Sequence, residues 1–223
     1  INRLKIYNID YELILINDGS SDSTKEEIEK ILDNKKISLI NNKTNQGKSF
    51  SVISTLPQCK FENILMIDCD LPYFDYFEQV IDEINKDYDL VVINRRLKES
   101  EIINKRLSTY QKARSLIGSI IGFFINFFLK INVDGADTQA GLKAFKKTKN
   151  FDNIRFYSKK FFFDLELIHT YSKLNKKILS LPVKYEIPSE SSIKILSLKN
   201  FYIIYELLKI IYLLKLKNSI NKI

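Results

Sequence analysis

Four short apolar runs separated by helical patterns constrain the fold of this 223-residue chain more than any other feature. Within each run the apolar residues follow one another with little alternation, as in strands that are covered on both faces. Strands that alternate with helices at this spacing predict an α/β fold with a mostly parallel, doubly wound sheet. The expected strands are 11–17, 37–42, 63–70 and 88–96.

Helical patterns fill the intervals and most of the second half. Ser23 and Glu26 have the spacing of a capping box, so a helix is expected to begin just after Ser23. In a later helix, Asp164 and Glu166 point to different faces, so at most one is expected to face a site and the other to be solvated. Further helices are expected at 74–86, 103–130, 159–176 and 201–217, and a short strand at 177–187.

Charged side chains stand at the carboxyl ends of the expected strands, where doubly wound sheets bind their ligands. Asp18 follows the first strand, Asp68 and Asp70 end the third, and Arg95 lies at the end of the fourth. Alternate residues of an extended strand face the same side, so Asp68 and Asp70 are expected to point at one site. Two carboxylates so close repel each other unless a cation lies between them, and Mg²⁺ or Mn²⁺ on a diphosphate meets that need. A turn with two solvated carboxylates is the alternative.

The charge balance is basic, since 35 Lys and Arg residues outnumber 27 Asp and Glu residues and give a net charge of +8. Such a surface suits phosphates, nucleic acid or anionic membranes. No nucleic-acid partner is expected, because the sequence has no recognisable nucleic-acid-binding motif and no aromatic-basic stripe. Cys59 and Cys69, with one His in the whole chain, form neither a zinc pattern nor a disulfide framework. A reducing, cytosol-facing compartment is therefore expected.

Two segments, 115–131 and 201–217, are strongly apolar, but neither has about 18 uninterrupted apolar residues. They are either core helices or helices that lie in a membrane interface with Lys and Tyr at the headgroups. The second alternative predicts a membrane-associated protein that is peripheral or monotopic rather than membrane-spanning.

Several ordered motifs resemble the inverting family 2 glycosyltransferases of the GT-A fold. "LILINDGSSDST" (13–24), "NQGKSFSV" (45–52) and "MIDCDL" (66–71) are similar to the nucleotide-binding segment, the next loop and the metal-binding D-x-D of that family. "VVINRR" (91–96) resembles a strand that ends in Gly-Ser-Arg. "DTQAGLKAF" (137–145), "FFFDLEL" (161–167) and "ESSIKI" (190–195) resemble the branch that acts on dolichyl and polyprenyl phosphates.

The resemblance implies roles for individual residues. Asp68 and Asp70 would hold Mg²⁺ or Mn²⁺, and with Asp137 they form the expected catalytic set. The donor, a nucleotide-sugar, would be bound by Asn17, Asp18, Gly19, Ser20, Gly47, Lys48 and Asp68. The acceptor phosphate would be bound by Arg95, Arg114, Gln139 and Lys194.

The chemistry agrees with this branch. An alcohol acceptor needs a general base, whereas a lipid phosphate is already an anion and needs only cations to hold it. The resemblance therefore implies transfer of a hexose to dolichyl or polyprenyl phosphate, with UDP-glucose as the favoured donor and GDP-mannose as the alternative.

The two ends of the chain carry separate expectations. Residues 1–195 are expected to form the GT-A domain, and residues 196–223 an amphipathic helix that faces a membrane. Relatives open with a strand that holds the nucleotide, whereas residues 1–10 resemble the end of the helix that follows it, so the sheet is expected to lack that strand. The other hypothesis is a truncated, non-catalytic relic of the fold that binds a partner or the membrane. The oligomeric state is not predicted.

Overall fold

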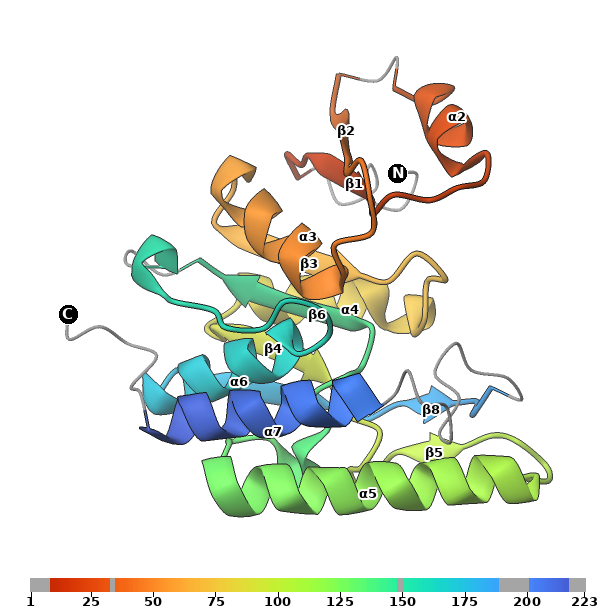
Figure 1. Cartoon of the computed structure of the whole chain (residues 1–223), viewed down its shortest axis with the longest axis vertical. Helices are drawn as coiled ribbons and strands as arrows, with labels where there is room; N and C mark the ends of the chain where they lie inside the picture. The colour runs from red at the N-terminus through yellow and green to blue at the C-terminus, as the bar shows by residue number, and fades with distance from the viewer. Residues whose placement is uncertain (1–8, 33–34, 148–150, 189–200, 217–223) are drawn as a thin grey trace. The chain divides into compact units, whose positions relative to one another are not determined.

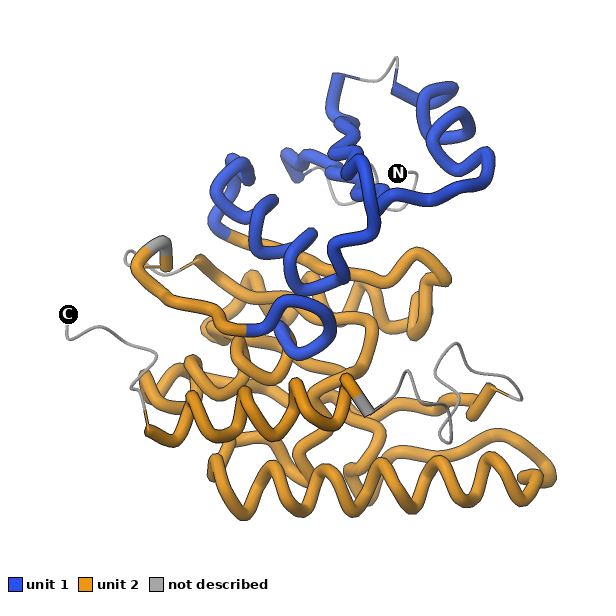
Figure 2. Tube along the Cα trace, viewed as in Figure 1, with its two compact units in different colours: residues 1–62, 158–163 blue, residues 63–157, 164–223 orange. Residues whose placement is uncertain are grey.

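The computed structural model describes residues 9–32, 35–147, 151–188 and 201–216 (Figure 1). The chain divides into two compact units (Figure 2). Unit 1 comprises residues 1–62 and 158–163, and unit 2 comprises residues 63–157 and 164–223. Each unit is described by itself below.

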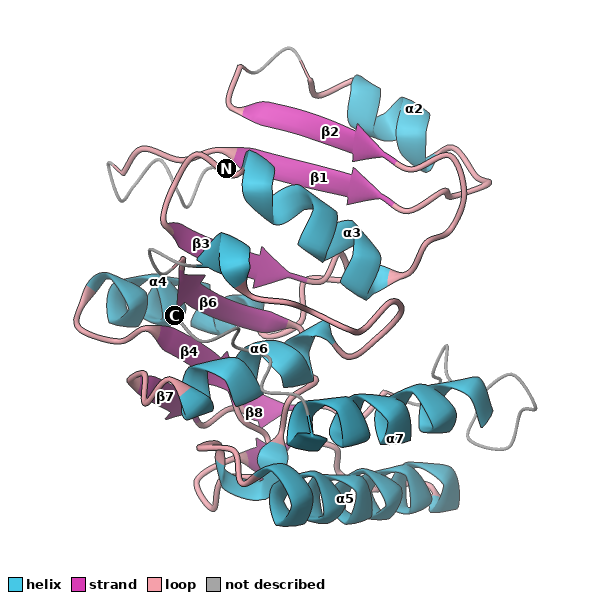
Figure 3. Cartoon of the chain, turned by 60° about the vertical axis from the view of Figure 1, so that its left-hand side comes forward, coloured by secondary structure: helices cyan, strands magenta, loops and turns pink. Residues whose placement is uncertain are grey.

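Unit 1 contains a two-stranded parallel sheet with helices (Figure 3). Strand β1 (Leu13–Asn17) pairs with β2 (Ile37–Asn41), and the register places Asn17 opposite Asn41. The helical elements of this unit are α2 (Thr24–Glu29), α3 (Lys48–Thr55) and η1 (Leu56–Gln58). The parallel pairing puts the carboxyl ends of both strands at the same edge, as the sequence predicted for this pair.

The capping box expected at α2 is wrong. Ser23 precedes the helix with φ −73° and ψ 13°, outside the extended conformation that an N-cap side chain needs, and it makes no capping hydrogen bond. Instead, Asp22 Oδ1 accepts a hydrogen bond from the backbone N–H of Thr24 at 3.0 Å. The preceding carboxylate has taken over one of the unpaired amides of the first turn.

Unit 2 is built on a four-stranded sheet of order β3-β6-β4-β7. The strands are β3 (Asn63–Ile67), β6 (Leu142–Lys146), β4 (Leu90–Ile93) and β7 (Ile178–Leu181). Strands β4 and β7 are parallel, whereas β6 runs antiparallel to both of its neighbours. No strand was predicted at 142–146. A parallel pair formed by β5 (Glu101–Ile102) and β8 (Lys184–Tyr185) completes the strands of the described residues.

Helices cover both faces of this sheet. On one face, Val80 and Ile84 of α4 (Phe77–Asn85) pack with Leu142 and Ala144 of β6 in the main hydrophobic cluster. Since side chains alternate along a strand, Lys143 and Phe145 point to the opposite face. There α6 (Phe163–Lys173) provides Asp164, which forms an ion pair with Lys143, and Tyr171, which packs edge-on against Phe145.

Both acidic residues at the start of α6 are buried, which corrects the expectation that one of them is solvated. Asp164 is 0% exposed and Glu166 is 1% exposed. Asp164 is paired with Lys143, and Glu166 Oε2 accepts a hydrogen bond from the backbone N–H of Tyr157 at 2.7 Å. Each buried carboxylate has its own donor, which compensates for the loss of water. The two residues therefore lie on different faces of α6 without differing in exposure.

Two long apolar helices complete unit 2. Helix α5 (Thr109–Leu129) begins at a full capping box between Ser108 and Gln111, which explains why it starts later than the predicted residue 103. Helix α7 (Phe201–Leu216) lies beside α5, and Lys215 Nζ sits 5.2 Å from the centre of the Phe128 ring (Figures 1 and 3). By length and composition α5 is able to cross a membrane, which corrects the expectation that neither apolar segment is long and apolar enough to span one. Only 17% of its most apolar window is buried within the protein, so α5 is not a core helix.

The Lys143–Asp164 pair gives a first test, because both side chains are at most 1% exposed. Removal of one partner leaves a charge without its counterion in the interior. We expect Asp164→Ala to lower the free energy of unfolding of unit 2 by about 3–5 kcal/mol, measured by urea denaturation. The double variant Lys143→Met, Asp164→Leu should recover most of that loss, since neither charge is then buried alone.

The matched control is Glu101→Ala, which removes an ion pair with Lys184 whose two side chains are more than half exposed. Solvent and salt screen such a pair, so its loss should change the unfolding free energy far less. Equal effects of Asp164→Ala and Glu101→Ala would contradict a stabilising role for the buried pair.

Candidate active site

Asp18 organises the loop that follows β2 in unit 1. Its Oδ1 accepts hydrogen bonds from Asn42 Nδ2 at 2.8 Å and from the backbone N–H of Gln46 at 2.9 Å, and its Oδ2 accepts one from the backbone N–H of Gly47 at 2.7 Å. Partial burial would raise the pKa of Asp18, but these hydrogen bonds lower it below its ordinary value of 3.8. The carboxylate is therefore ionised at neutral pH and holds two sequence-distant loops together.

The glycines of this region allow the two loops to touch. Gly19 has φ +72°, and a Cβ atom there would lie 2.5 Å from the backbone carbon of Thr44. Gly47 has φ +98°, and a Cβ atom there would lie 2.5 Å from Lys160 Cδ. Only glycine fits such positions without strain.

The remaining predicted donor-binding residues of unit 1 lie on the same loops. Asn17 donates to Asn41 Oδ1 at 2.8 Å and accepts from the backbone N–H of exposed Ser20 at 3.1 Å. Lys48 is the first residue of α3 and is half-buried. The first-turn amides of Ser49 and Phe50 donate to carbonyls of residues 159–160, so that helix end has already used these donors.

Asp68 and Asp70 lie after β3 in unit 2, but not on one extended strand as expected. The strand ends at Ile67, and residues 68–71 form a turn in which the N–H of Leu71 donates to the carbonyl of Asp68 at 2.9 Å. Asp68 is half-buried and Asp70 is exposed. The alternation argument was therefore wrong for Asp70, because its backbone is not extended with that of Asp68.

The chemistry of this turn nevertheless fits a hard cation. Gly141 leaves room for the Asp68 carboxylate, because a Cβ atom at 141 would lie 2.5 Å from Asp68 Oδ2 and 2.7 Å from Pro72 Cγ. Carboxylate oxygens are the ligands that Mg²⁺ and Mn²⁺ prefer. Within the described residues, no group of three or more His, Cys, Asp or Glu residues is arranged to hold a metal. A cation on Asp70 would thus need oxygens from a ligand or from water to complete its shell.

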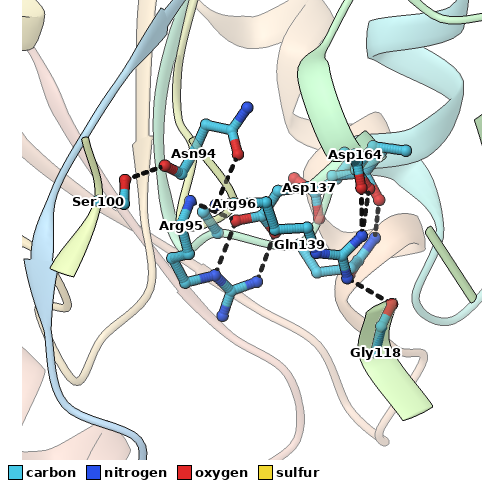
Figure 4. Close-up of polar contacts among 12 residues, drawn as sticks. Asn94, Arg95, Arg96, Ser100, Gly118, Asp137, Gln139 and Asp164 are labelled. Carbon is cyan, nitrogen blue, oxygen red and sulfur yellow. Dashed lines mark hydrogen bonds and ion pairs between the residues drawn. The ribbon is translucent and has the colours of Figure 1, made fainter. Parts of the chain in front are cut away.

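Arg95 and Asp137 form a bidentate ion pair beyond the end of β4 (Figure 4). Arg95 donates from Nε to Asp137 Oδ2 at 2.8 Å and from Nη2 to Oδ1 at 2.6 Å, and its backbone N–H also donates to Oδ2 at 2.8 Å. The Asp137 side chain is 1% exposed, whereas that of Arg95 is 28% exposed. The sequence predicted both residues as site residues without predicting that they bind each other.

The pair holds its two charges firmly. Burial opposes ionisation of both groups, but the mutual hydrogen bonds lower the pKa of Asp137 and raise the pKa of Arg95. Tyr73 lies nearby, and burial raises the pKa of its phenol against the opposing effect of Arg95. At neutral pH the group is an ionised carboxylate, an ionised guanidinium and a neutral phenol.

Asn94 and Arg96, which were not predicted as site residues, donate hydrogen bonds to the turn η3 (Asp134–Ala136) that precedes Asp137. Asn94 Nδ2 donates to the carbonyl of Asp134 at 2.9 Å, and Asn94 is 0% exposed. Arg96 donates to the carbonyls of Gly135 and Ala136. A signal was present in the sequence, since two adjacent arginines follow a strand, but their partners lie about forty residues away.

Within the described residues, no hydrogen bond or ion pair joins the other predicted acceptor residues to Arg95. Arg114 lies on α5, is half-buried, and has a buried Nη1 without a hydrogen-bond partner in the described part of the chain. Gln139 is exposed and donates to Thr138 Oγ1 at 3.4 Å. Lys194 lies outside the described residues. His169, which was expected in the core or on the surface, is buried, and burial lowers its pKa to about 4.

The family follows from comparison with known proteins. Residues 2–150 match the model of glycosyl transferase family 2. The chain belongs to this family. The match covers about two thirds of the chain, and it agrees with the family resemblance found in the sequence motifs.

Two curated relatives are named dolichyl-phosphate beta-glucosyltransferase. The protein from Trichomonas vaginalis is 29% identical over 197 residues, which cover 83% of this chain and 56% of the relative. The protein from Dictyostelium discoideum is 27% identical over 187 residues, which cover 78% of this chain and 55% of the relative. The chain thus spans about half the length of these relatives.

Solved structures agree with the fold. A crystal structure of glucosyl-3-phosphoglycerate synthase from Mycobacterium tuberculosis in complex with Mn²⁺, UDP-glucose and phosphoglyceric acid matches with a TM-score of 0.61 at 14% identity, over 90% of this chain and 69% of that one. The complex of the same enzyme with UDP matches with a TM-score of 0.60 at 15% identity, with the same coverage. The predicted GT-A fold class is confirmed.

The pair of Arg95 with Asp137 predicts a specific pH dependence. Because folding lowers the pKa of Asp137 below 3.8, its stabilising contribution is complete above that pH and is lost as the pH falls through the folded pKa. We expect Asp137→Asn to lower the free energy of unfolding by about 3 kcal/mol at neutral pH and by progressively less in acid as the pH falls below 3.8, as followed by circular dichroism in urea.

Asp134→Asn is the matched control, since this exposed acid lies three residues earlier, at the start of the turn η3 that leads into Asp137. It should change stability little at neutral pH and in acid. A cost of Asp137→Asn that does not shrink in acid would mean that the ion pair is not the source of the effect.

Proposed function

We propose that this family 2 protein transfers a hexose with inversion from a nucleotide-sugar, UDP-glucose, to dolichyl or polyprenyl phosphate. The observation that carries the proposal is the Arg95 cation, which is partly exposed, held by buried Asp137 and flanked by Arg96. The two curated relatives with a dolichyl-phosphate name supply the acceptor class. GDP-mannose is the alternative donor.

On the acceptor side the proposed work is electrostatic. The lipid phosphate is anionic at neutral pH, so it attacks the anomeric carbon without giving up a proton. Arg95 and Arg114, with Gln139 and Lys194, would hold and orient that phosphate. Asp137 orients Arg95 through two side-chain hydrogen bonds and acts as a positioning group rather than as a base, because its low pKa leaves it a weak proton acceptor.

On the donor side, Asp18 and its loops would bind the nucleoside, with contributions from Asn17, Gly19, Ser20, Gly47 and Lys48. Asp70, with Asp68, would hold Mg²⁺ or Mn²⁺. When bound, the cation would stabilise the charge of the diphosphate leaving group.

The same proposal includes a membrane surface on the cytosolic side. Helix α5 exposes large apolar side chains along its length, and α7 exposes several more. Lipid headgroups and acyl chains would cover these faces while the helices lie in the interface. The most exposed members on α5 are Leu116, Phe123, Phe124 and Phe127.

The decisive experiment is a transfer assay. The protein, expressed with whatever natural sequence adjoins it, is incubated with polyprenyl phosphate, Mg²⁺ or Mn²⁺, and labelled UDP-glucose or GDP-mannose. We expect transfer from UDP-glucose, and Asp70→Asn should lower kcat by about 10²-fold, about 3 kcal/mol in the barrier, because it removes a charged cation ligand.

Asp75→Asn, another exposed aspartate shortly after the same turn, serves as the control and should keep wild-type activity. Failure to transfer any sugar from either donor would reject the proposed activity and support the alternative of a non-catalytic relic. Activity of Asp70→Asn with unchanged metal dependence would remove Asp70 from the site.

The membrane proposal has its own test. Phe123 and Phe127 are 69% and 66% exposed on α5, so their replacement should not disturb the core. We expect the double variant Phe123→Ser, Phe127→Ser to weaken binding to vesicles of phosphatidylcholine and phosphatidylserine by about 10²-fold or more, since each of the two rings loses about 1.5–3 kcal/mol of burial. Vesicle flotation measures the loss.

Phe50→Ser is the control, because Phe50 is 45% exposed on α3 rather than on α5 or α7. It should float like the wild type. Equal flotation of all three proteins would show that α5 does not face lipid.

A further inference from the structure

Arg96 connects two elements that are far apart in the sequence. Its Nη2 donates to the carbonyl of Gly118 in the middle of α5 at 2.5 Å. Its Nη1 donates to the carbonyls of Gly135 and Ala136 in the turn η3. Within the described residues, its hydrogen-bonding side-chain nitrogens thus bond only to backbone oxygens, and a helix carbonyl still has a second lone pair with which to accept.

Glycines make the space for this side chain. A Cβ atom at Gly122, one turn after Gly118 on α5, would lie 1.7 Å from Arg96 Nη1 and 2.6 Å from the carbonyl oxygen of Gly135. Gly135 has φ +62°, and a Cβ atom there would lie 2.8 Å from Arg96 Cβ. At Gly118 the same atom would be 3.5 Å from Arg96 Nη2, which is an ordinary contact. The absence of side chains at Gly122 and Gly135 therefore makes room for the Arg96 side chain, whereas a methyl group at Gly118 would make only an ordinary contact with it.

The turn that Arg96 grips leads directly into Asp137. Asn94 holds the first residue of that turn, and its Oδ1 accepts a hydrogen bond from the backbone N–H of Arg96 at 3.0 Å. Asp137 in turn fixes the guanidinium of Arg95. A chain of hydrogen bonds thus runs from α5 through Arg96 and the turn to the Arg95 cation.

We propose that Arg96 is a positioning residue that ties α5 to the Arg95–Asp137 pair and so keeps the phosphate-binding cation at a fixed place relative to the apolar helix. The proposal rests on the proposed function, in which Arg95 holds the phosphate of a lipid acceptor and α5 faces the lipid. Such an acceptor has its charge and its hydrocarbon on one molecule, so both parts bind well only if cation and helix are in register. Arg96 then acts on recognition of the acceptor and not on binding of the donor.

The test compares Gly122→Ala with Gly118→Ala. Both changes replace glycine by alanine in α5 and improve helix propensity equally, but only the first obstructs Arg96. We expect Gly122→Ala to raise the KM for polyprenyl phosphate about tenfold or more, because Arg95 is then misplaced and its charge-assisted contact with the acceptor phosphate is weakened. The KM for UDP-glucose should change less than about twofold. Gly118→Ala should behave like the wild type.

Arg96 itself is changed in two ways. Arg96→Ala should raise the acceptor KM as Gly122→Ala does, and it does so without the second contact of Gly122→Ala, whose Cβ atom would also lie 2.6 Å from the carbonyl oxygen of Gly135. Arg96→Lys keeps the charge but has a single donor head that does not span both elements, so it should resemble Arg96→Ala. Full rescue by lysine would mean that the charge matters and the bridge does not, and this would overturn the proposal.

A second readout separates this proposal from the proposed function. Amide hydrogen exchange at residues 135–137 should accelerate in Arg96→Ala and Gly122→Ala, but not in Gly118→Ala, whether or not the protein transfers sugar. An inactive wild type with this exchange pattern would reject the activity and leave the tie between Arg96 and the turn in place. Unchanged exchange, or an unchanged acceptor KM in an active protein, would refute the positioning role.

Discussion

The buried carboxylate of Asp137 is the constraint on which the candidate acceptor site depends. A carboxylate removed from water needs a cation and several donors, and Arg95 supplies three hydrogen bonds from one residue. This requirement fixes the end of β4 against the segment that leads into β6. Because the backbone N–H of Arg95 takes part as well, the guanidinium and the main chain are oriented together, which leaves the cation little freedom to move.

A second buried ion pair in unit 2 involves β6 itself. Lys143 projects from the central antiparallel strand into the interior, where it donates to the carbonyl of Ala140 at 3.0 Å and pairs with Asp164 at the start of α6. Buried pairs of this kind add little net stability over apolar residues, but breaking one is costly. They therefore favour one arrangement of strands and helices over alternatives. In unit 2, the Lys143–Asp164 pair fixes α6 against β6, and the Arg95–Asp137 pair fixes the segment after η3 against the end of β4.

Local patterns in the sequence were sufficient for the strands β1, β3 and β4, because each is a run of apolar residues with its polar residue at the end. Strand β6 was missed because Lys143 interrupts the apolar pattern, and its burial depends on a partner twenty-one residues away. The position of Asp70 was wrong because the chain leaves the extended conformation at Asp68, and Leu71 adopts a positive φ of 51° that no local residue preference indicates. The space for the Arg96 side chain could not be predicted either, because Gly122 of α5 and Gly135 of η3, which form it, are distant from Arg96 in the sequence.

In the proposed function, the two adjacent arginines of the candidate acceptor site have different electrostatic roles. The Arg95–Asp137 pair has no net charge, so by itself it would present oriented hydrogen-bond donors to an anion but little net electrostatic attraction. Arg96 adds one uncompensated positive charge next to it, and its hydrogen bonds to carbonyls do not cancel that charge. A free arginine would lose about 2 kcal/mol of side-chain entropy when it bound a phosphate. In the proposed function that cost is met on folding, because Asp137 already immobilises Arg95, and the positive charge of Arg96 would attract the phosphate anion to it.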